Sequence, residues 1–123
     1  SDLDVKTLMM VDSLEMSDSD REIIIHNCQK TTSNHILITH GTDTMVKTAE
    51  AIAKEKISGK TIVLTGAMIP YAFGNSSDGF FNLGSALAFV QSLKPGIYIV
   101  MNGRYFDWNK VQKNTKTGFF EEK

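Results

Sequence analysis

The sequence is poor in several residues whose abundance would indicate particular classes of protein. Its 123 residues include one cysteine, Cys28, and two prolines. No internal disulfide can form, so a reducing cytoplasm is the expected location. With 13 basic and 14 acidic side chains, the net charge is -1, and this lack of a basic excess argues against a nucleic-acid partner. No apolar run approaches the roughly 18 residues that cross a bilayer, so no membrane partner is expected.

Hydrophobic residues make up 41% of the chain, enough to bury a core. We expect one domain over residues 1–123, although that length is short for a doubly wound fold. The sequence opens on Ser-Asp-Leu-Asp, with neither a methionine nor an export signal. We therefore expect a domain that is incomplete at its N-terminus.

Apolar runs and helical patterns alternate along the chain. Strands are expected at residues 5–10, 35–39, 61–65 and 96–101, with helices beginning near residues 17, 45 and 78. Ser17 and Asp20 have the spacing of a capping box, and Thr44 and Asp78 can cap the two later helices. The alternation predicts right-handed βαβ crossovers in an α/β fold, an open three-layer sandwich with a mostly parallel, flavodoxin/Rossmann-like sheet. The tail is less regular, with possible short strands at 104–106 and 118–120.

The most informative stretch is residues 35–44, where the apolar run Ile36–Ile38 stops at a cluster of polar side chains. Gly41, Thr42 and Asp43 are therefore expected in the crevice beyond a strand's carboxyl end, where open α/β sheets bind ligands. A threonine hydroxyl becomes a useful nucleophile when a carboxylate or a lysine helps to remove its proton. The sequence also allows two other interpretations of this turn. Its polar side chains can simply make turn and cap hydrogen bonds, or the start of the following helix can bind an anion.

Four segments carry a resemblance to a known family. They are Ile-Thr-His-Gly-Thr-Asp-Thr-Met at 38–45, Leu-Thr-Gly-Ala-Met-x-Pro at 64–70, Ser-Asp-Gly-x-Phe-Asn-Leu at 77–83 and Val-Met-Asn-Gly at 100–103. In type and order they resemble part of the N-terminal domain of the bacterial-type L-asparaginases. The resemblance implies an amidohydrolase that converts L-asparagine to L-aspartate and ammonia without a metal or organic cofactor. It also implies a small-molecule amino-acid amide as substrate and a homo-oligomer, a dimer or a tetramer.

By that resemblance, Thr42 is similar to the family's second catalytic threonine. Asp43 is similar to the aspartate that binds the substrate's α-amino group and belongs to a threonine-lysine-aspartate triad. Lys113 completes the triad, and Lys116 is its rival if the register slips. Without the resemblance, the polar tail around Lys113 would indicate an ordinary solvated lysine.

Other positions carry supporting roles by the same resemblance. Ser13 would hold the substrate's α-carboxylate, and Ala67 would form part of the crevice wall. Asn82 is expected to make structural hydrogen bonds, and His40 is expected to brace the turn without acting as a base.

The sequence also departs from the family pattern. Leu14 replaces a residue that is commonly polar, which puts strict amino-acid selectivity in doubt, and Ile69 replaces a common arginine. These residues contain no Gly-Gly-Thr-Ile motif, which carries the family's first catalytic threonine and follows its first strand. A sheet lacking that strand would leave a gap, bind the segment as a separate piece or rearrange. The alternative function is therefore a non-catalytic amino-acid-binding or assembly domain derived from the asparaginase fold.

Overall fold

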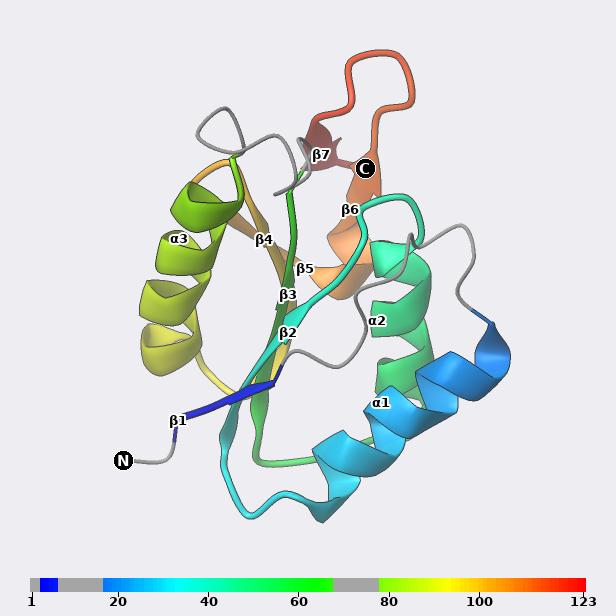
Figure 1. Ribbon diagram of the computed structural model, residues 1–123, viewed down its shortest axis with the longest axis vertical. Coiled ribbons are helices and arrows are strands. Elements are labelled where there is room, and N and C mark those ends of the chain that lie inside the picture. The colour runs from blue at the N-terminus through cyan, green and yellow to red at the C-terminus, as the bar shows by residue number, and fades with distance from the viewer. Residues whose placement is uncertain (1–2, 7–16, 68–77) are drawn as a thin grey trace.

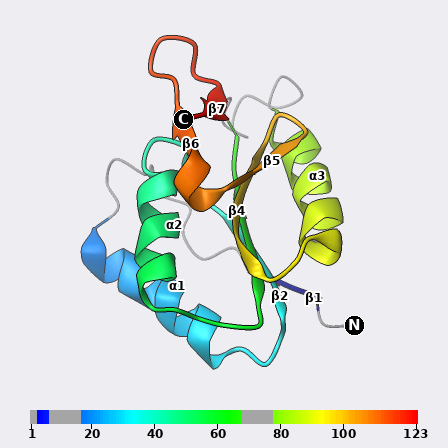
Figure 2. The ribbon, with the colours of Figure 1, turned by 180° about the vertical axis from the view of Figure 1, so that it is seen from behind.

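The computed structural model describes residues 3–6, 17–67 and 78–123, with the backbone alone for residues 3–6 (Figure 1). Helices cover both faces of one central sheet, and a small hairpin lies beyond one end of it (Figures 1 and 2). In the described residues, no helix is long and apolar enough to cross a membrane.

The central sheet has five strands, arranged in the order in which they occur along the chain. They are β1 (Leu3–Lys6), β2 (His35–Thr39), β3 (Thr61–Thr65), β4 (Gly96–Met101) and β5 (Arg104–Asp107). The first four are parallel, and β5 is antiparallel to β4. Because β1 pairs directly with β2, no gap separates them. The predicted strand at 5–10 overlaps β1 only in part, and its remainder lies outside the described residues.

Three α-helices and a short hairpin complete the described structure. They are α1 (Asp18–Lys30), α2 (Met45–Lys54), α3 (Gly79–Ser92), the 3-10 turn η3 (Trp108–Lys110), β6 (Val111–Lys113) and β7 (Phe120–Glu122). The predicted mostly parallel α/β fold is confirmed.

The first helix begins where its sequence predicts, and a lysine from another segment contacts its other end. The Ser17 side chain accepts a hydrogen bond from the Asp20 backbone, and the Asp20 carboxylate accepts one from the Ser17 backbone, which completes the capping box. At the other end, Lys60 Nζ donates to the carbonyl oxygens of Cys28 and Thr31, each at 2.7 Å. A cation at this end satisfies carbonyl groups that the helix leaves unpaired.

The later helices begin at the predicted cap positions, but their cap side chains act differently. Neither Thr44 nor Asp78 makes a capping hydrogen bond to the backbone through its side chain. The Asp78 carboxylate instead accepts a hydrogen bond from the Asn82 side chain, at 3.1 Å.

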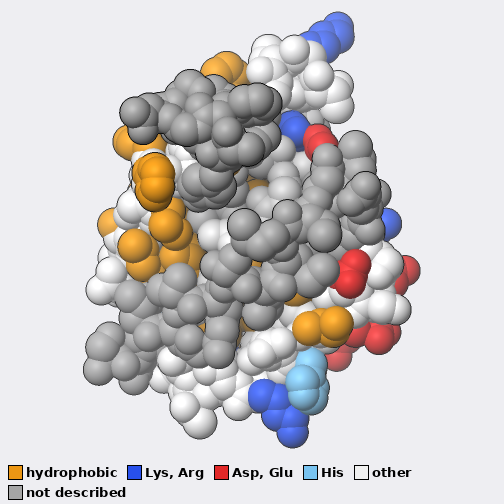
Figure 3. Space-filling view, viewed as in Figure 1, with side chains coloured by type: hydrophobic (Ala, Val, Ile, Leu, Met, Phe, Trp, Pro, Cys, Tyr) orange, Lys and Arg blue, Asp and Glu red, His pale blue; other side chains and the backbone are white. Residues whose placement is uncertain are grey.

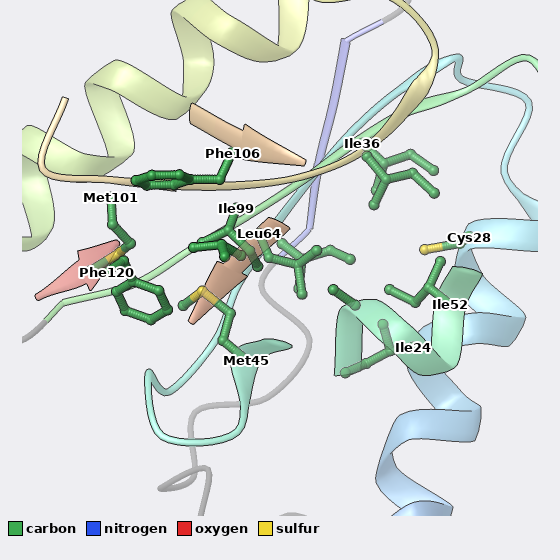
Figure 4. Packing of buried hydrophobic residues seen from close by; sticks show 14 residues of the cluster. Ile24, Cys28, Ile36, Met45, Ile52, Leu64, Ile99, Met101, Phe106 and Phe120 are labelled. Carbon is green, nitrogen blue, oxygen red and sulfur yellow. The ribbon is translucent and has the colours of Figure 1, made fainter. Parts of the chain in front are cut away.

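Strand residues point alternately to the two faces of the sheet and fill two cores. The larger core lies beneath α1 and α2 and includes Ile38, Leu64 and Met101 (Figure 4). The smaller core lies beneath α3 and includes Leu37 and Val63. Such burial of central strands on both faces explains why their sequences are continuously apolar.

One topological prediction is wrong. Strands β1 to β4 follow one another across the sheet, yet α3 lies on the opposite face from α1 and α2 (Figures 1 and 2). The first two crossovers are right-handed as predicted, so the β3–α3–β4 crossover is left-handed, a rare arrangement. With the strands in this order, a third right-handed crossover would have left the Leu37 and Val63 face without a covering helix.

The carboxyl ends of the strands are joined by short polar contacts. Thr39 is in register with Thr65, and the His40 backbone N–H donates to the Thr65 carbonyl oxygen at 2.9 Å. The fully buried Asn82 donates to the Gly66 carbonyl at 2.8 Å and accepts from the Asn102 backbone at 3.0 Å. The ends of β2, β3 and β4 therefore form one connected platform.

Gly66 is the tightest point of this platform, and its replacement tests the packing. A Cβ at Gly66 would overlap the His40 carbonyl oxygen, whereas one at Gly84, on the exposed side of α3, would meet nothing within 4 Å. We expect Gly66→Ala to lower the free energy of unfolding by about 1–3 kcal/mol, the usual cost of overpacking. The control Gly84→Ala should raise it by about 0.5–1 kcal/mol, because alanine favours helix. Urea unfolding measures both, and equal effects would contradict the close approach.

Candidate active site

The ammonium group of Lys113 lies between the side chains of Thr42 and Asp43. Its Nζ donates to Thr42 Oγ1 at 2.9 Å and to Asp43 Oδ1 at 2.6 Å. The Lys113 side chain is 18% exposed and that of Asp43 is 43% exposed, while Thr42 is buried. A charge-assisted contact to a carboxylate and a second contact to a hydroxyl fix the ammonium in one place.

Lys113 reaches this position because its hairpin is anchored in the core. Val111 and Phe120, which flank it on β6 and β7, are almost completely buried, and Phe120 lies beside Met45 and Met101 (Figure 4). The two core anchors fix the hairpin against the carboxyl end of the sheet. The solvated tail lysine that local sequence favours is therefore not what the structure shows.

The turn of the same hairpin is closed by Asn114. Its side-chain oxygen accepts from the backbone N–H groups of Lys116 and Thr117, at 2.9 and 3.1 Å. Its side-chain nitrogen donates to Glu121 at 3.0 Å. These contacts hold the chain directly after Lys113 and limit the directions in which the lysine can point.

A pocket of about 350 Å³ opens at this cluster. The described residues that line it are Thr42, Asp43, Val46, Val111, Gln112, Lys113, Thr115 and Lys123. The walls combine apolar side chains with a few convergent polar groups, as is usual for small-molecule sites.

His40 lies in a hydrogen-bonded chain behind the turn. Its Nδ1 is 2.6 Å from the Gly41 carbonyl oxygen, and its Nε2 is 2.8 Å from Thr48 Oγ1. Thr48 Oγ1 in turn accepts a hydrogen bond from Arg21 Nε at 2.9 Å. Burial lowers the pKa of His40 below its ordinary value of 6.5, and the nearby Arg21 charge lowers it further, against the opposing hydrogen bond to Gly41. At pH 7 the His40 ring is therefore neutral, and it supports the turn through its hydrogen bonds.

The structure places the residues that the sequence singled out in four different situations. Thr42, Asp43 and Lys113 come together, although their catalytic roles stay predictions. Ala67 follows β3 and is half-buried, but it is not among the described residues that line the pocket. Ser13 lies outside the described residues, and Lys116 is exposed on the hairpin turn.

Sequence reasoning missed Arg21 and Thr48. Arg21 has the spacing i, i+3, i+7 with Ile24 and Cys28, and all three are buried on one side of α1. A charged residue within an apolar helical stripe was the available signal. Cys28, on the same side of the helix, is also buried, and this burial raises the pKa of its thiol to about 11, which disfavours the reactive thiolate.

Within the described ranges, no three His, Cys, Asp or Glu side chains are grouped closely enough to hold a metal ion. The described side chains at the site offer a hydroxyl, an ammonium and a carboxylate. This set suits acyl-transfer chemistry on a polar substrate.

Fold and site together define an α/β domain with a candidate hydroxyl, ammonium and carboxylate site at the carboxyl end of a parallel sheet. The family model for the asparaginase N-terminal domain matches residues 1–120. The chain belongs to the asparaginase family.

The relatives support this membership over much of the chain. L-asparaginase 2 of Escherichia coli is 38% identical over 94 residues, which cover 74% of this chain and 26% of that protein. L-asparaginase 1 of the same organism is 33% identical over 116 residues, which cover 89% and 33%. The crystal structure of L-asparaginase I from Vibrio cholerae matches with a TM-score of 0.79 at 29% identity, over 91% of this chain and 35% of that one. The chain thus spans about a quarter to a third of these relatives.

The neutral state of His40 gives a testable pH dependence of stability. Because the folded state binds this proton more weakly than the unfolded chain, unfolding takes up a proton as the pH falls below about 6.5. We expect the free energy of unfolding to fall there, with a contribution of at most about 1.4 kcal/mol per pH unit. Urea unfolding between pH 5 and 8 should show a weaker dependence in His40→Gln than in the wild type. The matched control His26→Gln removes an exposed imidazole from α1, and an identical change in both variants would contradict the assignment.

Proposed function

We propose that the protein is an asparaginase-type amidohydrolase, which hydrolyses the side-chain amide of L-asparagine to L-aspartate and ammonia. The observation that carries the proposal is the Lys113 ammonium between Thr42 and Asp43, in a chain of the asparaginase family. Similar relatives include L-asparaginase 2 of Escherichia coli and the glutaminase-asparaginase of Acinetobacter glutaminasificans. L-Glutamine is therefore the second amide to test.

The proposed chemistry uses the three side chains as a proton path. Lys113 Nζ contacts both oxygens, so it can pass one proton to Asp43 Oδ1 as it takes another from Thr42 Oγ1. The Thr42 oxygen that results is an activated nucleophile, or it activates a water molecule for the same attack. A cation beside that oxygen also stabilises negative charge as it develops.

The bonds in this reaction balance without a further reagent. An oxygen nucleophile forms a bond to the amide carbon, the carbon-nitrogen bond breaks, and the nitrogen takes a proton and leaves as ammonia. The net reaction consumes one water molecule. Its hydroxyl group becomes part of the carboxylic acid product, and its other hydrogen accounts for the proton that the nitrogen gains.

Two further contacts are proposed for the substrate backbone. The Asp43 carboxylate is partly exposed in the pocket, and it would pair with the substrate's α-amino group. Ser13 would hold the α-carboxylate, and Ala67 would border the crevice. With both charged groups on the α-carbon held in this way, the side-chain amide at the other end of the substrate would be directed towards Thr42.

Replacement of the central lysine tests this proposal. We expect the intact protein to release ammonia from L-asparagine, and Lys113→Met to reduce kcat by about 10²–10⁴-fold, the usual contribution of general acid-base catalysis. Thr42→Val should have a comparable effect, because it removes the hydroxyl with little change of shape. A coupled assay of ammonia release measures both rates.

The chain offers a close control for this experiment. Lys116→Met removes an exposed lysine three residues away, on the same hairpin turn, and should leave kcat unchanged. Wild-type turnover in both Lys113→Met and Thr42→Val would defeat the proposal. Binding of L-aspartate by calorimetry, without ammonia release by the wild type, would favour the alternative amino-acid-binding domain.

We also propose that the protein is a homo-oligomer located in the cytoplasm. Large apolar side chains are exposed on α3, with Phe80 at 74% and Phe81 at 63%, and apolar groups gather over this helix (Figure 3). Exposed apolar patches of this kind are typical of protein interfaces. The cytoplasmic location is supported only by the single cysteine. Light scattering of the intact protein should give a mass of at least two copies, and a monomer would contradict the assembly.

A further inference from the structure

The turn between β4 and β5 consists of Asn102 and Gly103. Both residues are exposed, and both have positive φ values, 57° and 76°. Met101 and Arg104, on either side of them, are paired with each other. Positive φ at both positions of such a loop is characteristic of a type I′ hairpin, for which Asn-Gly is a favoured sequence. The proposed hydrolysis uses neither residue.

Asparagine followed by glycine is also a chemically reactive pair. The backbone nitrogen of the following residue can attack the asparagine side-chain amide. Glycine hinders this attack least, because it has no side chain. Asn102 is the only asparagine in the sequence that precedes a glycine, so the chain has a single position where the reaction is sterically favoured.

The closed turn keeps the reacting atoms apart. In a type I′ turn, the ψ angle of the first central residue is about +30°, the mirror image of the value in a type I turn. At this angle the Gly103 nitrogen lies nearly opposite the Asn102 Cβ about the Cα–C bond, so it points away from the side-chain amide. Attack requires a rotation about that bond, which the Met101–Arg104 pairing prevents.

The two sides of this turn are anchored unequally. On the β4 side, the Asn102 N–H donates to the fully buried Asn82 side chain at 3.0 Å, and β4 pairs with both β3 and β5. On the other side, β5 has four residues, lies at the edge of the sheet and pairs only with β4 among the described strands. Short edge elements open locally at a lower free energy than central strands do. The turn therefore opens from the β5 side.

We propose that Asn102 is a site of spontaneous deamidation, which takes place when β5 separates locally from β4. The Gly103 nitrogen forms a bond to Asn102 Cγ, and the bond from Cγ to Nδ2 breaks. The leaving nitrogen takes the hydrogen of the glycine N–H and departs as ammonia. Water then opens the succinimide ring that results. Cleavage at Cγ gives aspartate, and cleavage at the main-chain carbonyl carbon gives isoaspartate.

Isoaspartate changes the turn more than aspartate does, because its main chain runs through Cβ and Cγ and is longer by a methylene group. A two-residue loop has no slack for this addition, so β5 shifts against β4. β5 leads through η3 into β6, which carries Lys113. Formation of isoaspartate therefore displaces the hairpin that places this lysine beside Thr42.

Incubation of the folded protein at mildly alkaline pH, followed by peptide mass spectrometry, measures the reaction. We expect aspartate and isoaspartate to accumulate at position 102, about tenfold or more slowly than in the chain unfolded by guanidinium chloride. Exposed Asn109, which precedes Lys110, is the internal reference and should react far more slowly in the unfolded chain. Equal rates at position 102 in the two states, or no product there in the folded protein, would overturn the proposal.

Two core variants distinguish local opening from global unfolding. Phe106→Leu weakens the buried anchor of β5, whereas Ile52→Val makes a small cavity beneath α2. Urea unfolding gives the globally unfolded fraction of each variant, and each rate is corrected for it. We expect Phe106→Leu then to deamidate about fivefold faster than Ile52→Val, as the loss of a part of a buried anchor allows. Equal corrected rates would overturn the local opening of β5.

Only the effect on catalysis rests on the proposed hydrolysis. Asn102→Asp gives the aspartate product with an ordinary backbone and should retain the wild-type kcat for ammonia release from L-asparagine. Aged wild-type protein should lose kcat in proportion to its isoaspartate content, and full activity of the isoaspartate form would contradict the displacement of the hairpin. The mass-spectrometric results hold whether or not the protein hydrolyses L-asparagine, so failure of either proposal is distinguishable from failure of the other.

Discussion

The alignment of the carboxyl ends of β2 and β3 is the constraint on which the rest of the site depends. The hydrogen bond from the His40 N–H to the Thr65 carbonyl continues the strand pairing one residue beyond β2. Because Gly66 has no side chain, the segments after β2 and β3 can approach closely. The turn that carries Thr42 starts from this point. Strand pairing therefore determines where this turn begins. The contacts of Lys113 and the hydrogen bonds of His40 then stabilise the turn in that position.

Much of the fold could be predicted from the sequence, because burial on both faces leaves a strong pattern. The apolar runs that became β2, β3 and β4 are short, continuous and followed by polar residues, and each adopts the predicted strand. The capping box at Ser17 is a local signal and is observed. The hand of the third crossover could not be predicted in this way. It depends on which face of the sheet still needs a covering helix, which is a property of the whole assembly.

The candidate site was less accessible to sequence reasoning for a similar reason. Thr42 and Asp43 follow a buried strand, and their place in a crevice could be inferred from that alone. Lys113 has no such local signal, since polar residues surround it and its position depends on core anchors at Val111 and Phe120. Only the family resemblance identified it in advance. Arg21 was missed because a helical arginine is normally solvated, and its burial depends on Thr48 from another helix.

The origin of Lys113 in a distant hairpin has a consequence for how the site is assembled during synthesis. The lysine and Thr42 lie 71 positions apart in the chain. Their contact closes a long loop, so the conformational entropy lost in that closure is lost late in folding. A nascent chain that has emerged as far as η3 already contains the residues of β2, β3 and β4, together with the threonine. The ammonium is still inside the ribosome at that stage. The chain therefore acquires its potentially reactive pair only after the scaffold that confines it has been made.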